Sequence, residues 1–575
     1  MRPVPFVTVA VLSCFFASVS SSAQSTVAED TNRAPIAKQQ DKPVMDLDTD
    51  FASITPTGPG CAVGVGIADG APLIRSYGLA DLEHPMPITA ATVFETGSLA
   101  KQFTASAILV LVQDGRLALD DNIRRYLPEM PDYETPITIR HLLTHTSGLR
   151  EQWSLLALAG NPPGTQVHTQ SMILDLASRQ KGLNFKPGAE FLYTNTNYVL
   201  AAIIVERVSG KSLQRFTDER LFQPLGMTHS RWREDYRTVV PGRATAYVSS
   251  GDAFIGGMPF TNVYGNGGLL TTIDDLLRWN AFLDDPSEFP GSKALVAALQ
   301  TPGKLNNGKA IEYALGLEVT RTHGLRLIAH SGSTGGYKTW LGRYPDKGIS
   351  VAVLCNNGDV DPVKLGEKVA EQALHATGYT EKELAGSVSG PSPLIAPALS
   401  VDLTPYQGLF RNPVTGDLIE TKIVDRQLTF QHGATQVLIS TGDGRFRRTD
   451  GVALHFVSTK GKIVELTLGD DASSQRYVAV APFKTGNDTF AAYVGTYYSA
   501  ELDKRISVVR NGDTLLMRQP FAIEWPLAPS FADAFTTRLR GTTTFIFART
   551  PAGQVSGFAA WATGARNIQF VRESR

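Results

Sequence analysis

The sequence predicts an α+β protein in which a cluster of helices covers an antiparallel sheet and two small antiparallel β-barrels follow. Two observations predict the sheet. Strand-like runs at 61–70 and 73–81 precede a block of helical segments, and another at 349–356 follows it. The third observation is an internal repeat. Tyr406-Gln407-Gly408 returns as Tyr493-Val494-Gly495 among short strands and turns, which indicates two barrels of similar size.

Ser98 stands three residues before Lys101 at the start of an apolar segment that ends at Asp114-Gly115. The apolar pattern predicts a buried helix with Ser98 in its first turn and Gly115 near its C-cap. The spacing places both side chains on one helix face, where burial lowers the pKa of the lysine and lets it act as a neutral base. Ser98 is thereby a candidate nucleophile. Alone, the pair is more typical of an N-cap serine beside a lysine that reaches solvent, so other motifs must decide.

Two further elements lie downstream. Tyr193 and Asn195 precede an apolar helical segment and can both point into a cleft, the tyrosine for proton transfer and the asparagine as an amide donor. Alone, they are more typical of a helix cap. His330, Gly332 and Ser333 lie where a strand runs into a glycine-rich segment, which leaves backbone amides free for an oxyanion hole.

The composition is that of an ordinary globular protein. The chain has 575 residues, 42% hydrophobic and 19% charged, with a formal net charge of −1. This length predicts several domains. The charge gives no electrostatic attraction to nucleic acid or anionic lipid, so no nucleic-acid partner is expected.

Residues 1–23 predict a secretory signal peptide, with a charge at Arg2, an apolar core and small residues before a cleavage point after Ala23. The apolar core is too short for an integral membrane span. We therefore expect an exported protein, periplasmic or secreted. A lipoprotein anchor at Cys14 is the less favoured alternative, and residues 24–55 are polar and aperiodic, as in a disordered, solvated leader.

Cys61 and Cys355 each lie in an apolar strand-like run, a setting more typical of buried thiols than of a disulfide. His141 and His145 have a spacing that can bind zinc on a helix, but no glutamate lies between them and no third ligand is evident. We interpret both as structural histidines. No metal and no cofactor is predicted.

Taken in this order, the SxxK at Ser98, the YxN at Tyr193 and the His330-Ser331-Gly332 run resemble the motifs of the serine β-lactamase and penicillin-binding protein superfamily. The resemblance is to the branch of class C β-lactamases, D-alanyl-D-alanine carboxypeptidases, D-aminopeptidases and related esterases, the S12-type peptidases. The HTSGL run at 145–149 and the NGGLLTT run at 266–272 support it. It covers about residues 58–376 and implies a β-lactamase-like fold.

The resemblance also implies roles for the residues. Ser98 would attack a carbonyl to form an acyl-enzyme, and Lys101 and Tyr193 would move its proton. Which of these two is the general base stays open. Asn195 would hold the substrate amide, and the backbone amides of Ser98 and Ser333 would form the oxyanion hole.

His330 and Gly332 would line the opposite wall of the cleft. Many relatives carry a lysine at the position of His330. A neutral imidazole attracts a carboxylate less than an ammonium does, which argues slightly against a dedicated carboxypeptidase or an efficient β-lactamase. The run Lys484-Thr485-Gly486 spells the commoner form of this motif, but it lies outside the matching region and is interpreted as a turn.

The implied function is that of an exported serine hydrolase acting through an acyl-enzyme on amide, peptide or ester bonds, with D-amino-acid-containing peptides as the favoured substrates. D-aminopeptidase and D-Ala-D-Ala carboxypeptidase are the favoured types. One alternative is a promiscuous esterase or weak β-lactamase, and another is a non-catalytic penicillin-binding-like scaffold. The sequence does not indicate the oligomeric state.

The C-terminal repeat resembles the lipocalin-like accessory domains of D-aminopeptidase-type relatives. It is interpreted as a structural appendage, and a loop that enters the cleft is the alternative. The predicted organisation is a signal peptide at 1–23, a leader at 24–55, a hydrolase domain at 56–378, a linker at 379–398, and barrels at 399–484 and 485–575.

Overall fold

A computed structural model describes residues 45–67, 70–380, 401–432, 434–469, 474–483, 490–520 and 523–574. The predicted signal peptide, most of the predicted leader and linker, and the 484–486 run lie outside the described residues. The structure differs from the prediction at the end of the leader. Leu47 and Phe51, one helical turn apart, are buried against the sheet, and the Phe51 ring stacks on Tyr77 with centroids 4.6 Å apart. The folded part therefore begins before residue 56.

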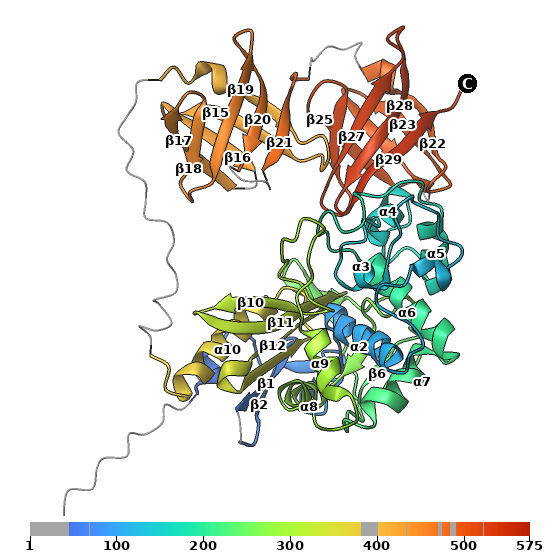
Figure 1. Ribbon diagram of the computed structural model, residues 1–575, viewed down its shortest axis with the longest axis vertical. Helices are drawn as coiled ribbons and strands as arrows, with labels where there is room; N and C mark the ends of the chain where they lie inside the picture. Colours follow the sequence, from blue (N-terminus) through green and yellow to red (C-terminus); the bar gives the residue numbers. More distant parts are fainter. Residues whose placement is uncertain are drawn as a thin grey trace, which may run out of the picture. The chain divides into compact units, whose positions relative to one another are not determined.

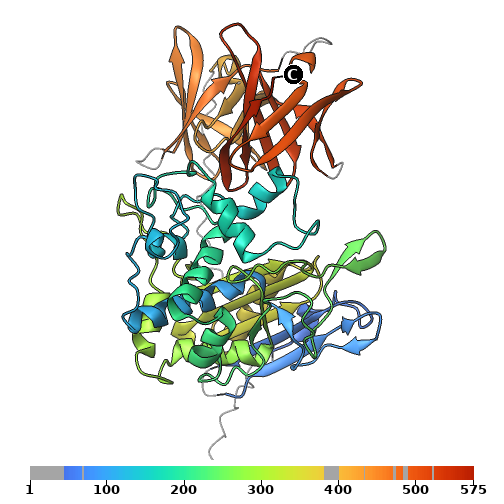
Figure 2. The same cartoon turned by 90° about the vertical axis from the view of Figure 1, so that its right-hand side faces the viewer.

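A six-stranded antiparallel sheet is the centre of the first domain (Figure 1). In sheet order its strands are β10 (Glu318–Thr322), β11 (Leu325–Thr334), β12 (Tyr337–Tyr344), β13 (Ile349–Cys355), β1 (Cys61–Ile67) and β2 (Leu73–Tyr77). Strands from the two ends of the domain thus lie side by side, the early ones blue and the late ones yellow-green in Figure 2.

Helices cover both faces of this sheet. The α-helices of the described residues are α1 (Leu47–Asp50), α2 (Ala100–Gln113), α3 (Ile139–Leu143), α4 (Gln152–Leu158), α5 (Gln170–Ser178), α6 (Asn195–Ser209), α7 (Leu213–Thr217), α8 (Ile273–Asp284), α9 (Ser292–Leu299) and α10 (Pro362–Ala376). Helices α8 and α10 contact the strands of the sheet, and α3, α4 and α5 pack on α6. Successive residues of β1 face opposite layers: Val63 packs in one cluster with α1 and α10, and Ala62 in the other with α2 and α8.

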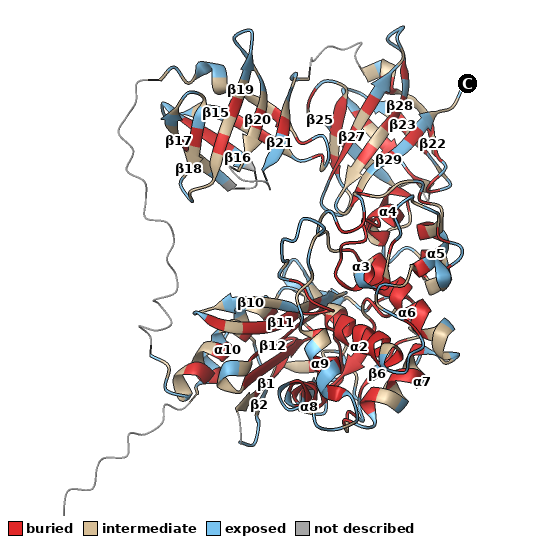
Figure 3. Cartoon of the chain, in the orientation of Figure 1, coloured by how far each residue is buried: buried red, intermediate tan, exposed pale blue. Residues whose placement is uncertain are grey.

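Glycine at position 64 lets α8 approach β1, because a Cβ there would lie 2.6 Å from a methyl carbon of Ile273. Helix α2 is buried almost throughout its length, as Figure 3 shows in red. A helix buried on all sides reads as a continuous apolar run, which is the pattern that the sequence has there.

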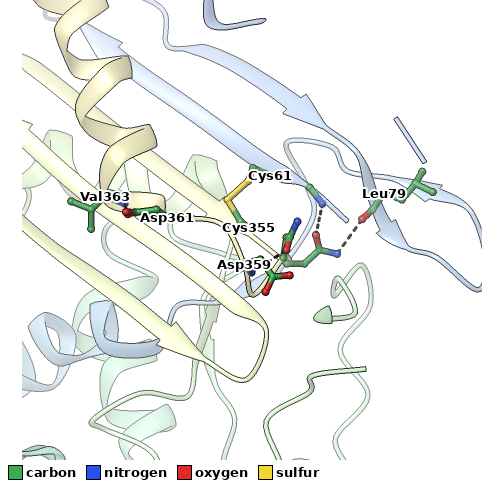
Figure 4. The surroundings of a disulfide bond; sticks show 9 residues. Cys61, Leu79, Cys355, Asp359, Asp361 and Val363 are labelled. Carbon is green, nitrogen blue, oxygen red and sulfur yellow. Dashed lines mark hydrogen bonds between the residues drawn. A yellow bond between two sulfur atoms is a disulfide. The ribbon is translucent and has the colours of Figure 1, made fainter. Parts of the chain in front are cut away.

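Cys61 and Cys355 form a disulfide, so the prediction of two buried thiols is wrong (Figure 4). The two residues are direct partners in the antiparallel pairing of β1 with β13, and their Cα atoms lie 4.0 Å apart. The sequence pattern predicts both strands but not that they are neighbours, and only that pairing brings the sulfur atoms together.

Short strands in the described part of this domain form three smaller sheets, β3-β4, β5-β9-β6 and β7-β8. The strands are β3 (Leu79–Asp81), β4 (Met86–Pro87), β5 (Phe94–Glu95), β6 (Arg231–Trp232), β7 (Tyr247–Ser250), β8 (Ala253–Gly256) and β9 (Leu269–Thr271). Strand β5 pairs with β9, and β5 leads directly into the turn that carries Ser98.

Two closed eight-stranded antiparallel barrels follow, and the predicted fold class is confirmed. The first consists of β14 (Gly408–Arg411), β15 (Leu418–Val424), β16 (Gln427–His432), β17 (Ala434–Gly442), β18 (Arg445–Arg448), β19 (Ala453–Thr459), β20 (Lys462–Leu468) and β21 (Gln475–Val480). The second consists of β22 (Gly495–Ser499), β23 (Lys504–Asn511), β24 (Thr514–Arg518), β25 (Glu524–Pro529), β26 (Ala534–Arg538), β27 (Thr542–Arg549), β28 (Val555–Ala562) and β29 (Ala565–Arg572).

The repeat in the sequence corresponds to equivalent interior positions of the two barrels. Phe410 and Tyr497 occupy matching places in the two copies, and both are buried inside their barrels.

None of the helices in the described ranges is long and apolar enough to cross a membrane.

Candidate active site

Ser98 lies at the entrance to the central helix. Gly97–Leu99 form one 3-10 turn that continues directly into α2, and the helix ends before Gly115, whose φ of 68° suits the residue after a C-cap. The hydroxyl oxygen of Ser98 lies 3.0 Å from Nζ of Lys101. The two side chains therefore meet as their spacing predicts.

The amine of Lys101 is buried among three oxygen atoms. Nζ lies 3.0 Å from Ser98 Oγ, 2.9 Å from Asn195 Oδ1 and 2.7 Å from the carbonyl oxygen of Asn266. The two asparagine oxygens can only accept hydrogen bonds. A neutral amine has two N–H bonds and one lone pair, so when both N–H bonds go to the asparagines the lone pair faces the Ser98 hydroxyl.

Burial lowers the pKa of Lys101 to about 7, and the negative charge of Glu151 opposes this only in part. A substantial fraction of the amine is therefore neutral near pH 7. The ring of Tyr193 covers it, with the ring centroid 4.8 Å from Nζ.

Tyr193 faces Ser98 from the loop before α6. Burial raises the pKa of its hydroxyl well above the ordinary value, and a hydrogen bond with Ser98 offsets part of that rise. Tyr193 consequently keeps its proton where Lys101 can already have lost one. Its ring packs on His145, with centroids 4.2 Å apart.

Asn195 is the first residue of α6, and the partners of its side chain fix the amide orientation. Its Oδ1 accepts from Lys101, and its Nδ2 donates to Oε1 of Glu151 at 3.1 Å. Oε2 of Glu151 also accepts from the backbone N–H of Asn195 at 2.5 Å and from Thr194 Oγ1 at 3.0 Å. Asn195 therefore lies beside the nucleophile, with one of its amide hydrogens already engaged by protein.

Glu151 contacts Asn195 of the candidate site, and the sequence analysis did not single it out. It is nearly buried and joins the start of α6 to the loop before α4. The available signal was an acidic residue two positions after the HTSGL run, and nothing local showed which residue its carboxylate would face. The contact spans 44 positions.

His330 lies on β11 beside Tyr193, with ring centroids 6.2 Å apart. Burial lowers its pKa to about 3, so the imidazole is neutral, as the sequence analysis assumes. Its Nδ1 lies 2.6 Å from the carbonyl oxygen of Ser331, and its Nε2 lies 3.0 Å from the hydroxyl of Tyr313. Both ring nitrogens thus have protein partners, and a direct hydrogen bond to substrate would require one of these bonds to break.

Two glycines bring the Ser98 turn against β11. A Cβ on Gly97 would lie 2.6 Å from the backbone nitrogen of Ser333, and a Cβ on Gly332 would lie 1.9 Å from the carbonyl oxygen of Thr96. Gly332 therefore permits the close approach of two backbone segments rather than offering a side chain. The approach brings the backbone amide of Ser333 next to the turn that holds Ser98, where an oxyanion hole requires it.

Two cavities meet at Ser98. One, of about 550 Å³, is lined by Ser98, Tyr193, His330, Gly332 and Ser333 among others. The other, of about 510 Å³, is lined by Ser98, Asn195 and Ser333 and has an apolar wall that includes Trp153 and Phe260. The predicted site residues are therefore gathered around one hydroxyl, with open space on both sides of it.

His141 and His145 occupy separate structural positions. His141 closes the N-terminus of α3 in a capping box with Thr138. His145 is buried, and its Nδ1 accepts from the backbone N–H of Thr194. Across the described ranges no group of three or more histidine, cysteine or acidic side chains could hold a metal ion.

The second barrel packs against the loop that carries Glu151. Arg150 and Glu501 form an ion pair at 2.5 Å, with side chains only 4% and 7% exposed. The carbonyl oxygen of Gly564, in the turn between β28 and β29, accepts from the backbone N–H of Glu151 at 2.8 Å. Arg150 and Glu501, which are 351 positions apart in the sequence, thus meet next to Glu151, the residue that contacts Asn195.

Comparison with known proteins gives matches over the first domain. The Beta-lactamase family model matches residues 55–374. D-aminopeptidase from Brucella anthropi is 32% identical over 304 residues, which is 52% of this chain and 56% of that protein. Penicillin-binding protein 4* from Bacillus subtilis is 31% identical over 329 residues, 54% of this chain and 71% of that protein. The chain thus spans about half the length of the D-aminopeptidases that it matches.

A solved structure shares the fold. The octameric penicillin-binding protein homologue from Pyrococcus abyssi superposes with a TM-score of 0.51 and 24% sequence identity, covering 75% of this chain and 97% of the other. The SxxK pair is in contact, and the family model matches more than half of the sequence, so the chain belongs to the beta-lactamase family.

Proposed function

We propose that this protein is an exported hydrolase that forms an acyl-enzyme at Ser98 and cleaves amide, peptide or ester bonds, with D-amino-acid-containing peptides as its substrate class. One observation carries the proposal. The Ser98 hydroxyl lies 3.0 Å from the buried amine of Lys101, whose pKa is about 7.

Lys101 is the general base for acylation. Its lone pair accepts the Ser98 proton while Oγ attacks the substrate carbonyl carbon, and the carbonyl π electrons move to oxygen. The backbone amides of Ser98 and Ser333 stabilise that oxyanion. Tyr193, which keeps its proton at neutral pH, donates it to the leaving nitrogen or oxygen as the bond to carbon breaks, and the proton held by Lys101 passes back to Tyr193.

Deacylation reverses these roles. Water enters the site, gives a proton to the Lys101–Tyr193 pair and attacks the acyl carbon. The bond from that carbon to Ser98 Oγ then breaks, and Oγ regains a proton from the same pair. Asn195 orients the substrate with its free amide hydrogen, and His330 shapes the wall through its hydrogen bond to Tyr313.

The relatives support the substrate class. The curated matches carry the names D-aminopeptidase and Penicillin-binding protein 4*, and the region matched by the family model contains Ser98, Lys101, Tyr193, Asn195, His330 and Ser333. The Cys61–Cys355 disulfide supports export, because disulfides persist in oxidising compartments outside the cytosol.

A substrate panel tests this function. D-aminoacyl peptides, acyl-D-Ala-D-Ala, p-nitrophenyl esters and a cephalosporin are each assayed with the full chain. We expect the highest kcat/KM on D-aminoacyl peptides. Preferential turnover of esters or of the cephalosporin would instead assign the protein as an esterase or weak β-lactamase. Absence of turnover and of any covalent adduct would indicate a non-catalytic scaffold.

Replacing Tyr193 by Phe removes one hydroxyl beside Ser98 and keeps the ring over Lys101. We expect kcat to fall about a hundredfold on amide substrates, as for the loss of a positioned proton donor. Tyr198→Phe is the matched control, because Tyr198 lies in the same aromatic cluster and donates instead to the carbonyl oxygen of Leu143. Equal rates for the two variants would remove Tyr193 from the mechanism.

A further inference from the structure

The turn between β28 and β29 of the second barrel contacts the chain at Glu151 and Ser154, next to the active site. The carbonyl oxygen of Gly564 accepts from the backbone N–H of Glu151 at 2.8 Å and from Asn184 Nδ2 at 2.9 Å. The carbonyl oxygen of Thr563 accepts from Ser154 Oγ at 2.6 Å. The barrel thereby fixes the backbone of Glu151 itself, and not only a distant surface of the domain.

A buried ion pair secures the same segment one residue earlier. Arg150 donates to Oε1 of Glu501 at 2.5 Å and to Oε1 of Gln180 at 3.1 Å, and the backbone N–H of Lys181 donates to the same oxygen of Glu501 at 2.8 Å. Removing either partner of so buried a pair would leave an unpaired charge in a low-dielectric interior, which is energetically costly. The pair therefore holds the Arg150 segment against the barrel.

Glu151 passes this constraint to the nucleophile. Its carboxylate holds the backbone and the side chain of Asn195, and Asn195 Oδ1 is one of the acceptors that orient the Lys101 amine toward Ser98. Each link is a hydrogen bond between described residues, through backbone or side-chain atoms. A displacement of Glu151 by a fraction of an ångström therefore changes the direction of the Lys101 lone pair.

We propose that the second barrel is a working part of the active site, in which Gly564 and Glu501 are positioning residues that set Glu151 and, through it, Asn195 and Lys101. This inference rests on the proposed function, because it concerns the efficiency of the same Ser98 chemistry. It replaces the interpretation of the repeat as an appendage.

Two turn glycines of the same barrel give a matched test. Gly564 has φ 71°, and a Cβ there would lie 2.7 Å from Cβ of Glu151. Gly553 has φ 81° and no atom within 4 Å of a Cβ. Alanine at either position incurs a similar backbone cost, and only Gly564→Ala pushes on Glu151.

Activity is measured on one ester and one peptide, normalised to the sites that a fluorophosphonate titrates. We expect Gly564→Ala to lower kcat at least about tenfold, since a misplacement of 1 Å can cost a hundredfold, and Gly553→Ala to stay within about twofold of wild type. The acid limb of the pH profile should move to lower pH in Gly564→Ala, because Glu151 then supports the Lys101 cation less.

Glu501→Gln is the second variant, and Glu190→Gln is its control. Glu190 pairs with Arg566 of the same barrel at 3.0 Å but makes no contact with Glu151. We expect Glu501→Gln to lower kcat per titrated site and Glu190→Gln to leave it unchanged. If Gly564→Ala and Glu501→Gln lose only thermal stability, with kcat, KM and the pH profile of wild type, the barrel has no positioning role. A wild-type chain with no turnover and no adduct would instead refute the proposed function.

A separate observation concerns the substrate. Arg540, in the loop between β26 and β27, lines the 510 Å³ cavity that contains Ser98 and Asn195. The other charged residues of that lining, Glu95 and Arg233, pair with each other at 2.9 Å. Arg540 is exposed and has no acidic partner within 4.0 Å among the described residues. It is therefore the cation that this cavity offers to a ligand.

The geometry points to Arg540 as a specificity residue that binds a carboxylate of the substrate. A guanidinium matches a carboxylate with two parallel hydrogen bonds. The carboxylate can belong to the acyl part or to the leaving group. This assignment also rests on the proposed function.

Two substrate pairs separate those sources. Mono-p-nitrophenyl glutarate against p-nitrophenyl butyrate places the charge on the acyl part, and a D-aminoacyl dipeptide acid against its amide places it on the leaving group. We expect Arg540→Ala to lower the acid-to-neutral ratio of kcat/KM about tenfold for one pair, and Arg540→Lys to lower it less. The ratio should also fall with added NaCl.

Arg538→Ala is the control, because it removes the same charge two residues earlier, outside the cavity lining. It should keep the wild-type ratio for both pairs. If Arg540→Ala keeps the wild-type ratio for both pairs, the assignment is wrong although hydrolysis stands. Failure of the wild type to cleave any of the four substrates would count against the proposed function itself.

Discussion

Replacing Ser98 by Ala should abolish turnover, by at least about a thousandfold, and leave the fold intact. The variant loses the oxygen that attacks the substrate in the proposed mechanism, and it loses little buried volume, because the residue lies in a short turn at the cavity wall. Steady-state rates on every substrate that the wild type accepts measure the loss, and the thermal unfolding midpoint checks the fold.

Ser106→Ala is the matched control. Ser106 lies on the same helix, is buried, and donates its hydroxyl to the carbonyl oxygen of Gln102 at 2.8 Å, away from both cavities. It should retain wild-type rates. Mass spectrometry after fluorophosphonate treatment should place the adduct on Ser98 in wild type and in Ser106→Ala. A stable adduct on another serine, or full activity of Ser98→Ala, would defeat the assignment.

The sequence predicts those site residues that lie close together in the chain or that belong to a motif of a known family. Ser98 and Lys101 are three residues apart, so one helical turn brings them together whatever the rest of the chain does. Tyr193 and His330 could be placed near them only because the motifs resemble a known family. Hydrophobic patterning alone does not bring those positions to one cleft.

The part that the sequence did not predict consists of contacts between distant positions. Glu151 reaches Asn195 across 44 residues, and Asn266 reaches Lys101 across 165. The same reason explains the error at Cys61 and Cys355, which are 294 residues apart. Cys61 and Cys355 each lie in a correctly predicted strand, but the partner of each depends on which elements become neighbours.

The barrels show the same limit at the level of domains. Their interior is predictable in part, because Phe410 and Tyr497 stand at equivalent positions of the repeat, and both are buried. The contacts of their surface are not predictable from the sequence. Glu501 and Gly564 look like ordinary residues of polar turns, and only the folded first domain shows what they contact. The inference that the second barrel positions Glu151 therefore comes from the structure and not from the sequence.

Replacing Lys101 by Met should lower kcat/KM about a thousandfold or more, because methionine fills the same space and cannot accept the Ser98 proton. In the wild type, kcat/KM should rise with pH through a midpoint near 7 and then level off, since the neutral amine is the active form. His330 cannot produce this limb, because its pKa is about 3. A midpoint near 10 would show that the amine is not the base.

The stability of the same variant tests the buried amine without any substrate. Between pH 7 and 10.5 the unfolded chain holds a proton on Lys101 that the folded chain has lost, so the free energy of unfolding of the wild type rises with pH across this window. Lys101→Met lacks that dependence. Its stability relative to wild type should therefore be greatest below pH 7 and decline toward pH 10, as denaturant unfolding at each pH can measure. A difference that does not change with pH would mean that Lys101 titrates alike in both states, and the pairing of its lone pair with the Ser98 hydroxyl would lose its basis.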